Sequence, residues 1–351
     1  MQAQAAVCPF PVAPQPRIRA DIYRFDALPD YYREAEQSGA GHFVLDAAFT
    51  EYLEQKLQIL QQAPQLHRCY HCPDAEQAAG LAAALWQVLA LFAQEQPHCL
   101  QADAAGYVLP QLGLRLIKQN LTAELSLEPA QAPQAALGQR IYAYLQQQQG
   151  LARLLDVVGL CMQEDIVIMR GTSNQATREA ASDNTANDYA EALQVCFPSA
   201  WNPRSRLGQD FGAIHAPVAH SYRLQQAQPR VMQALLSKGP FLRFVWSISP
   251  HASLNHNPAW PASGYNQPAS DDLPSLEQLY FRVERQTTCA FPALQRCMFS
   301  IRIFQQPLLE VVHNADRRQR LGQALQAMDA AHLRYKSLDK LLPMLLPWLE
   351  S

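Results

Sequence analysis

The sequence predicts an α+β fold, because helical and strand patterns occupy different stretches of the chain. In residues 49–155 and 321–345, apolar side chains recur at three- and four-residue spacing, which is typical of amphipathic helices. Between residues 163 and 304, runs rich in β-branched and aromatic side chains take over, and two of them alternate in period two, as half-buried strands do. We therefore expect both helices and antiparallel strands.

Two helices are predicted before residue 100. Residues 49–60 place aromatic and leucine side chains on one helical face. The second helix follows Asp74, a residue type that caps helix N-termini, and Glu76 adds the negative charge that a first turn favours. It runs to about residue 93, with an apolar stripe of Leu81, Leu85, Val88, Leu89 and Phe92.

A short hairpin is expected over residues 106–117 and a further helix over residues 141–155. The glutamines at 146–149 are interpreted as a solvated face of that helix. Strands are predicted over residues 163–169, 241–249, 279–288 and 296–304, and the last two should pair antiparallel. A helix near residues 225–236 should lie between the first two of these strands.

The remaining segments are expected to be loops or terminal helices. Residues 172–187 are predicted as a polar loop, and residues 249–272 as an irregular loop on the surface. One late helix should carry Leu321, Leu325, Met328 and Ala331, and a last one Leu341, Leu342 and Leu345. Residues 1–20 are expected to follow the surface without regular structure, and residues 21–351 to form one domain.

Composition and charge exclude several classes of partner. Of the 351 residues, 48% are hydrophobic and 17% charged, and the formal net charge is −3, so nucleic acid and anionic membranes are not expected as partners. No apolar stretch is expected to reach the roughly 18 residues that span a bilayer. Because the N-terminus lacks the features of a secretory signal and the eight cysteines are scattered, we expect free thiols and a cytoplasmic protein.

Residues 67–73 bring histidine and cysteine close together. A c-type haem attachment would need a histidine after the second cysteine, but the residue there is Pro73. Zinc could recruit Cys69 and Cys72, with two further ligands from His67, His98 or Cys99. No second pair at zinc-site spacing exists, so a loop before a helix is the favoured interpretation.

His215 is the candidate ligand that the backbone holds most firmly. Pro217 fixes its own backbone angle and biases Ala216 towards extended geometry. An imidazole on such a segment can be aimed at a metal or haem iron with little ordering cost. The alternative is that His215 only satisfies backbone groups at the end of a turn.

Several motifs in order resemble the bacterial haem-dependent oxidative N-demethylase family, over roughly residues 20–345. They are Gln163-Glu164-Asp165, Phe197-Pro198-Ser199 with Trp201, Ile214-His215 with Pro217-Val218, Arg243 with Trp246, Val283 to Thr287, Phe299 to Arg302, and Tyr335-Lys336.

The resemblance implies a PAS-like antiparallel sheet core with surrounding helices, which binds haem b without a covalent link. It further implies that His215 is the ligand of the haem iron. The implied reaction uses O₂ to remove a methyl group from a small secondary amine such as dimethylamine, and it releases formaldehyde. Electrons are expected from a separate flavin or iron–sulfur reductase subunit.

The resemblance also places site residues. Haem is an apolar disc with two carboxylates, so it needs an aromatic slot with basic groups at the rim. The aromatic walls are expected from Phe197, Trp201, Phe211 and Trp246. The basic rim is expected from Arg204, Arg206 or Arg243 and from Arg285, although each arginine could instead be a solvated surface charge.

Glu284 is the candidate catalytic carboxylate. It lies between Arg282 and Arg285 on a predicted strand, where it could stay ionised and receive a protonated amine. The alternative is an internal ion pair that holds the sheet. Because neighbouring strand residues point to opposite faces, at most one of Glu284 and Arg285 should face the haem.

The chain departs from the family pattern at two positions that lack an expected polar group, Val245 and Ala290. These departures leave other functions open. One is a haem-binding sensor or carrier without turnover, which a second ligand such as His220 would favour. Another is a haem-free assembly subunit.

Overall fold

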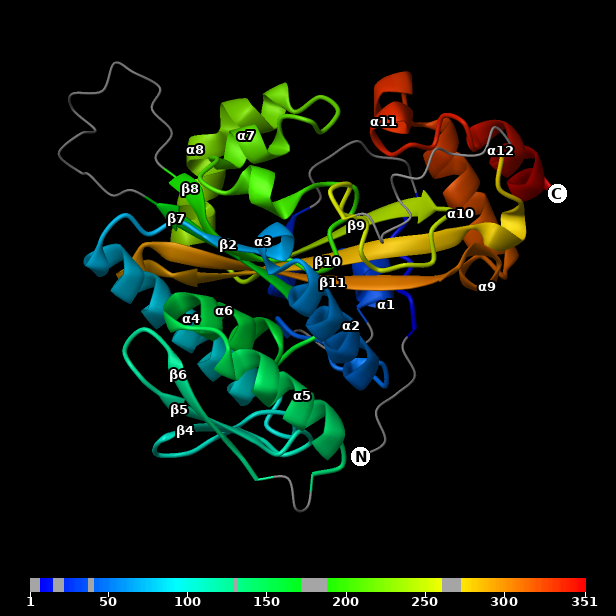
Figure 1. Ribbon diagram of the computed structural model, residues 1–351. Coiled ribbons are helices and arrows are strands. Elements are labelled where there is room, and N and C mark those ends of the chain that lie inside the picture. The colour runs from blue at the N-terminus through cyan, green and yellow to red at the C-terminus, as the bar shows by residue number, and fades with distance from the viewer. Residues whose placement is uncertain (1–6, 15–21, 37–40, 129–131, 172–187, 261–272) are drawn as a thin grey trace, which may run out of the picture.

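The computed structural model describes residues 7–14, 22–36, 41–128, 132–171, 188–260 and 273–351. Figure 1 shows helices packed around a long, twisted antiparallel sheet, with a smaller sheet below it. The prediction of an α+β fold is therefore confirmed.

The large sheet has seven strands in the described part of the chain, and all of its pairings are antiparallel. Their order is β1 (Tyr23–Arg24), β9 (Phe241–Ser249), β10 (Tyr280–Phe291), β11 (Arg296–Pro307), β7 (Asp165–Gly171), β8 (Asp188–Gln194) and β2 (Arg68–Tyr70). The predicted hairpin of β10 and β11 is confirmed, and both strands extend further than expected. Only β1, β2 and β8 have no predicted counterpart.

One side of the large sheet packs on helices that bury its apolar face. They are α2 (Phe49–Gln62), α4 (Ala75–Glu95), α5 (Ala135–Gln146) and α6 (Gly150–Gly159). Below them lies the small sheet of β3 (Gln101–Ala102), β4 (Gly106–Leu109), β5 (Leu114–Lys118) and β6 (Ala123–Leu127). The helices predicted over 49–60 and 75–93 and the hairpin over 106–117 are confirmed, and Asp74 caps α4 by accepting from the Gln77 amide.

In the view of Figure 1, two groups of helices rise above the large sheet at its two ends. At one end lie the short 3-10 helix η3 (Pro203–Arg206), α7 (Phe211–His215) and α8 (Tyr222–Ser237). At the other end lie α10 (Ala315–Gln326), α11 (Ala330–Tyr335) and α12 (Leu342–Glu350). Elsewhere in the described residues the helices are α1 (Asp30–Ala35), α3 (Pro64–His67) and α9 (Leu308–Val311), with short 3-10 turns at residues 25–27, 276–278 and 292–294.

Two predicted helices are each broken in the structure. The helix expected over 141–155 is divided into α5 and α6 at the glutamine run, where Gly150 adopts a φ of +53°. The helix expected to join Leu321 and Ala331 ends at Gln326, and Ala331 belongs to α11. Residues 172–187 lie outside the described residues.

The loop after β9 is not on the surface as expected. Asn255 and Asn257 are buried in its described part, residues 250–260. Their side chains accept from the Asn257 and Ala259 amides respectively, so the loop satisfies its own backbone in the interior. The N-terminal stretch 7–13 has no helix or strand, as predicted, but Cys8, Phe10 and Val12 are buried.

By length and composition α4 could cross a membrane, which corrects the expectation that no stretch would reach that length. Leu81, Leu85 and Leu89 on its apolar face are fully buried between the two sheets. In this fold α4 is a core helix. All eight cysteines are free thiols, as predicted.

Candidate functional site

The segment that leads towards His215 is fixed where it leaves β8. The Asp165 carboxylate accepts from the Phe197 amide at 2.7 Å. Arg282, only 1% exposed, donates to the carbonyls of Phe197 and Leu254, each at 2.9 Å, and to the Ser199 hydroxyl. The buried guanidinium therefore joins β10 to two loops, and burial lowers its pKa to about 10.

The Gln163-Glu164-Asp165 motif has a structural role. Gln163 and Glu164 accept from the backbone amides of Asp46 and Val44, and Lys56 lies 3.3 Å from Asp165 in a fully buried ion pair. These contacts hold the chain before α2 and the chain after β8 against the same point of β7.

His215 ends α7 with a defined pattern of protonation. Its Nδ1 lies 2.7 Å from the Phe211 carbonyl oxygen; because a carbonyl only accepts, Nδ1 carries the proton and Nε2 keeps its lone pair. Burial lowers the pKa of His215 to about 4, and the charges of Arg243 and Arg206 act in the same direction. The ring is therefore neutral at physiological pH, which is the form that ligates metals.

Arg243 on β9 is the basic group of this region without a bonded partner. It is half-buried, and no residue in the described ranges forms a hydrogen bond or ion pair with its guanidinium. Its charge nevertheless lowers the pKa of His215 and of Lys336. A half-buried cation of this kind suits an anionic group of a ligand.

Glu284 on β10 belongs to the same sheet face as Arg243. It lies opposite Val245, and its neighbour two residues on, Gln286, lies opposite Arg243. Gln286 Nε2 donates to the Glu284 carboxylate at 2.5 Å. Within the described chain Glu284 forms no ion pair closer than 4 Å, so the internal ion pair weighed from the sequence does not form.

Lys336, in the chain that follows α11, adds a further charge to the group of Arg243 and Glu284. Lys336 Nζ donates to the Trp246 carbonyl at 2.5 Å and lies 5.0 Å from the centre of the Trp246 ring. Burial, followed by the charge of Arg243, lowers the pKa of Lys336 to about 8, while Glu284 opposes the shift. The Glu284 carboxylate also raises the pKa of Tyr335, in addition to the larger effect of burial.

The predicted aromatic walls take different positions. Trp246 is half-buried and stacks on Phe281 with ring centres 5.8 Å apart. Trp201 is half-buried and packs with the apolar cluster under α7 and α8. Phe197 is 1% exposed and packs edge-on against Tyr52, so it is a core residue and not a wall of the site.

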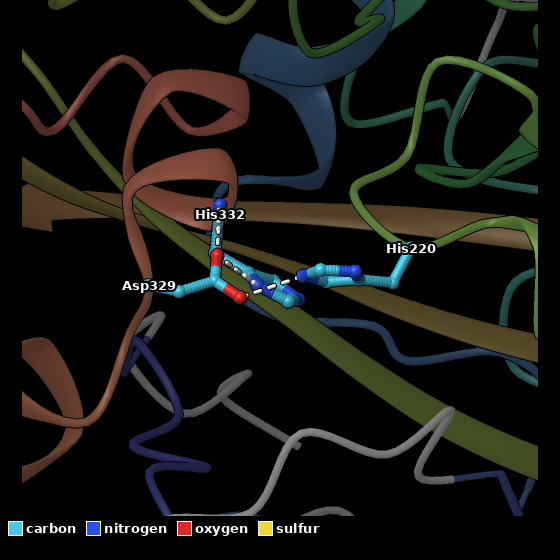
Figure 2. A group of neighbouring side chains, drawn as sticks. All are labelled: His220, Asp329 and His332. Atoms are coloured by element: carbon cyan, nitrogen blue, oxygen red, sulfur yellow. Dashed lines mark hydrogen bonds and ion pairs between the residues drawn. The ribbon is translucent and has the colours of Figure 1, made fainter.

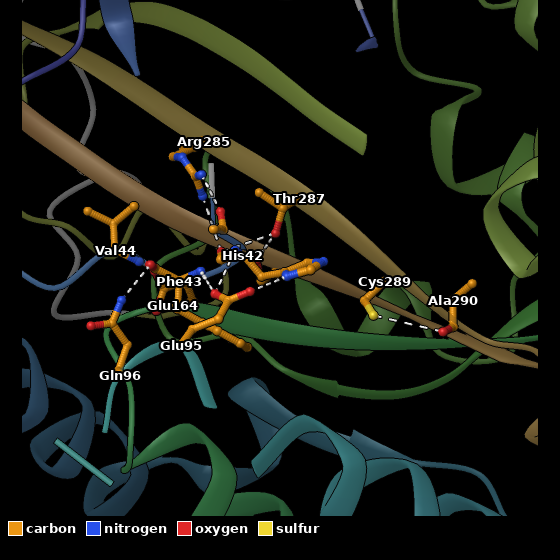
Figure 3. Close-up of polar contacts among 12 residues, drawn as sticks. His42, Phe43, Val44, Glu95, Gln96, Glu164, Arg285, Thr287, Cys289 and Ala290 are labelled. Atoms are coloured by element: carbon orange, nitrogen blue, oxygen red, sulfur yellow. Dashed lines mark hydrogen bonds and ion pairs between the residues drawn. The ribbon is translucent and has the colours of Figure 1, made fainter. Parts of the chain in front are cut away.

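Arg285 is not brought to this cluster. It points to the opposite face of β10, is 2% exposed, and forms a 2.6 Å ion pair with Glu36. It also donates to the carbonyls of Gly41 and His42. Figure 3 shows this network around His42, which Glu95 completes with a 2.6 Å contact to His42 Nδ1. Arg285 therefore holds a structural segment.

The zinc ligands considered from the sequence are dispersed. His67 Nδ1 donates to the Val195 carbonyl and its Nε2 faces the Asn255 amide, while Cys69 and Cys99 lie in different apolar clusters. His220, considered as a second haem ligand, has its Nε2 2.6 Å from Asp329.

Sequence reasoning named Arg206 as a possible partner of a haem propionate, but it did not single out Gln286 or Lys336 as site residues. Lys336 appeared only as part of the Tyr335-Lys336 motif. It lies far from Glu284 in the sequence, and no pattern indicated that the two residues would interact. Gln286 could have been found by period-two alternation, since it shares a strand face with Glu284.

A sequence model of the family described as haem-dependent oxidative N-demethylase, alpha subunit-like, matches residues 37–346. This range includes the whole cluster around His215, Arg243, Glu284 and Lys336. The chain therefore belongs to the haem-dependent oxidative N-demethylase alpha-subunit-like family.

Proposed function

We propose that this chain binds haem b on a PAS-like core and catalyses oxidative N-demethylation of a small secondary amine such as dimethylamine. Membership of the family makes it an oxidoreductase subunit of a haem-dependent enzyme with partner subunits. The observation that carries the proposal is the free Nε2 lone pair of a neutral His215, which feels the charge of Arg243, a half-buried arginine that no described residue pairs.

The residues around His215 fit haem in charge and offer an apolar ring contact. Arg243 has no partner in the described chain, and Arg206 bonds only to the Gln209 side chain there. Two arginines near one imidazole oppose its protonation and match the two propionates of haem. Phe211, with its ring 4.2 Å from that of His215, supplies an apolar contact.

When bound, haem supplies the activation of O₂ and the oxidation of the N-methyl group. The balanced reaction consumes a secondary amine, O₂, two electrons and two protons, and yields a primary amine, formaldehyde and water. The two electrons require a reductase, for which we propose a flavin or iron–sulfur partner subunit. Free thiols throughout the chain are consistent with a reducing, cytoplasmic location.

The chain's own residues hold and orient the substrate. We assign Glu284 the role of receiving the protonated amine, because the carboxylate has no bonded cation among the described residues and Gln286 fixes one of its oxygens. Lys336 and Arg243 bring positive charge to the same region, and the Glu284 carboxylate opposes the fall in the pKa of Lys336.

The proposal is tested by the absorption spectrum of protein produced with adequate iron and haem precursor. We expect a Soret band that His215→Ala removes or strongly weakens. The matched control is His313→Ala, which changes an exposed histidine bonded only to the Glu310 carbonyl and to Asn314 in the described chain. Protein that stays colourless and takes up no added haemin would contradict the proposal.

A further inference from the structure

Two segments far apart in sequence meet at His220, Asp329 and His332 (Figure 2). His220 lies in the turn between α7 and α8, whereas Asp329 caps α11 and His332 lies in its first turn. The Asp329 carboxylate reaches His220 Nε2 at 2.6 Å through one oxygen and His332 Nδ1 at 3.0 Å through the other. One candidate ligand atom from each residue lies within 4.8 Å of the other two.

This donor set has the chemistry of a metal site. Two imidazoles and one carboxylate are ligands that zinc, cobalt and other first-row divalent ions accept, at bond lengths of about 2.0–2.2 Å. The Asp329 carboxylate is ready for this role, since hydrogen bonds from the His332 amide and from both imidazoles lower its pKa. The rings of His220 and His332 lie 4.9 Å apart and tilt by only 38°, so small side-chain rotations bring the nitrogens around one ion.

The solvent exposure of these side chains and the backbone geometry of His220 are consistent with a metal site. The side chains of His220 and Asp329 are 43% and 44% exposed, so an ion can enter and water can complete its coordination. His220 adopts a φ of +57°, which is uncommon for residues other than glycine and directs its ring towards α11.

We propose that His220, Asp329 and His332 bind one divalent first-row transition-metal ion, which joins the α7–α8 turn to α11. Each neutral imidazole would ligate the ion through the lone pair of one ring nitrogen and carry its proton on the other. The site is distinct from the haem ligand, because His215 directs Nδ1 to Phe211 within α7. It links the segment that follows His215 to the helix that precedes Lys336.

Cobalt(II) is the probe for this site, used on the purified full chain after treatment with a chelator. Its visible absorption distinguishes nitrogen and oxygen ligands from cysteine thiolates, which matters because Cys72 and Cys289 are only half-buried. We expect one equivalent to bind without a thiolate charge-transfer band, and to raise the thermal unfolding midpoint. The titration is made on haem-free protein, so failure of haem binding does not affect it.

Three variants make the assignment specific. His220→Ala and Asp329→Asn should each weaken cobalt binding at least tenfold, while His313→Ala leaves it unchanged. Asparagine caps helices as well as aspartate does, so Asp329→Asn keeps α11 intact while it removes the charged ligand. Absence of stoichiometric binding, or binding that survives both substitutions, would overturn the proposal and identify the cluster as a hydrogen-bonded link without metal.

Discussion

His215 donates a hydrogen bond from Nδ1 to a carbonyl of its own helix. Arg243 forms no ion pair with any residue that the structure describes. Both features follow from local geometry: a carbonyl four residues earlier in α7 fixes the imidazole, and β9 directs Arg243 to the face that Glu284 shares. The sequence identified all three residues. Period-two alternation also predicted that Glu284 and Arg285 would face opposite sides, but it did not say which one would face the site.

Arg243 and Arg285, both expected at the haem rim, should respond differently to substitution. We expect Arg285→Ala to lower the free energy of unfolding by about 3 kcal/mol, since it removes the cation from a buried ion pair. We expect Arg243→Ala to change it by less than about 1 kcal/mol, since no ion pair is lost, but to weaken haem binding. Urea denaturation and haemin titration measure the two effects, and equal stabilities would contradict the assignment.

Glu284→Gln tests the proposed amine contact. Removing the charge should raise the KM for a secondary amine by about tenfold, a loss of about 1.4 kcal/mol, while the Soret band remains. Formaldehyde release with a supplied reductase measures this, and Glu310→Gln, an exposed change on α9, is the control. An unchanged KM would remove Glu284 from the substrate site.

The pKa of Lys336 predicts a pH dependence of stability. Its folded value of about 8 lies below the ordinary 10.5, so between these pH values the unfolded state holds more protons and stability rises with pH. Below pH 8 the cost of burying the ammonium is present in full. Lys336→Met should therefore show a smaller gain in unfolding free energy between pH 7.5 and pH 10 than the wild type. An identical gain in both proteins would show that Lys336 keeps an ordinary pKa.

At the scale of elements, segments with strong hydrophobic periodicity were predicted correctly, whereas a helix break that depends on local backbone conformation was missed. Alternation over β10 and β11 located the central hairpin, and the stripe of α4 located a core helix. The break between α5 and α6 was missed because it depends on the left-handed conformation of Gly150. β8 was missed because nearly all of its residues are buried, which leaves no alternation to detect.

Two glycines in these helices give a matched test of the backbone argument. Gly150→Ala meets no neighbouring atom, so we expect only the strain of a positive φ, about 1 kcal/mol. Gly138→Ala would place its Cβ 1.8 Å from the Leu112 carbonyl oxygen, so we expect a loss of about 2–3 kcal/mol. Urea denaturation ranks the two, and a larger loss for Gly150→Ala would refute this explanation.

At the scale of the molecule, the fold brings charged and polar residues from four distant segments within electrostatic reach of one another. Arg243 and Glu284 share a sheet face, whereas Lys336 lies against the ring of Trp246, which points to the other face. α7 provides His215, β9 and β10 provide Arg243 and Glu284, and the chain after α11 provides Lys336. No local pattern encodes these contacts, so no sequence observation indicated that Lys336 would interact with Arg243 and Glu284. The motifs that carry the family resemblance include these segments, which come together in the fold. The motif of Gln163 to Asp165 has a different role, because its side chains accept hydrogen bonds from backbone amides.

Ligation of the haem iron by His215 is the claim on which the functional account depends most. Its most direct measurement is the absorption spectrum of haem-loaded His215→Gly, recorded before and after addition of free imidazole. We predict a weakened or shifted Soret band in the variant and a return towards the wild-type spectrum when imidazole occupies the vacated position. A variant whose spectrum equals that of the wild type, with no response to imidazole, would contradict ligation by His215.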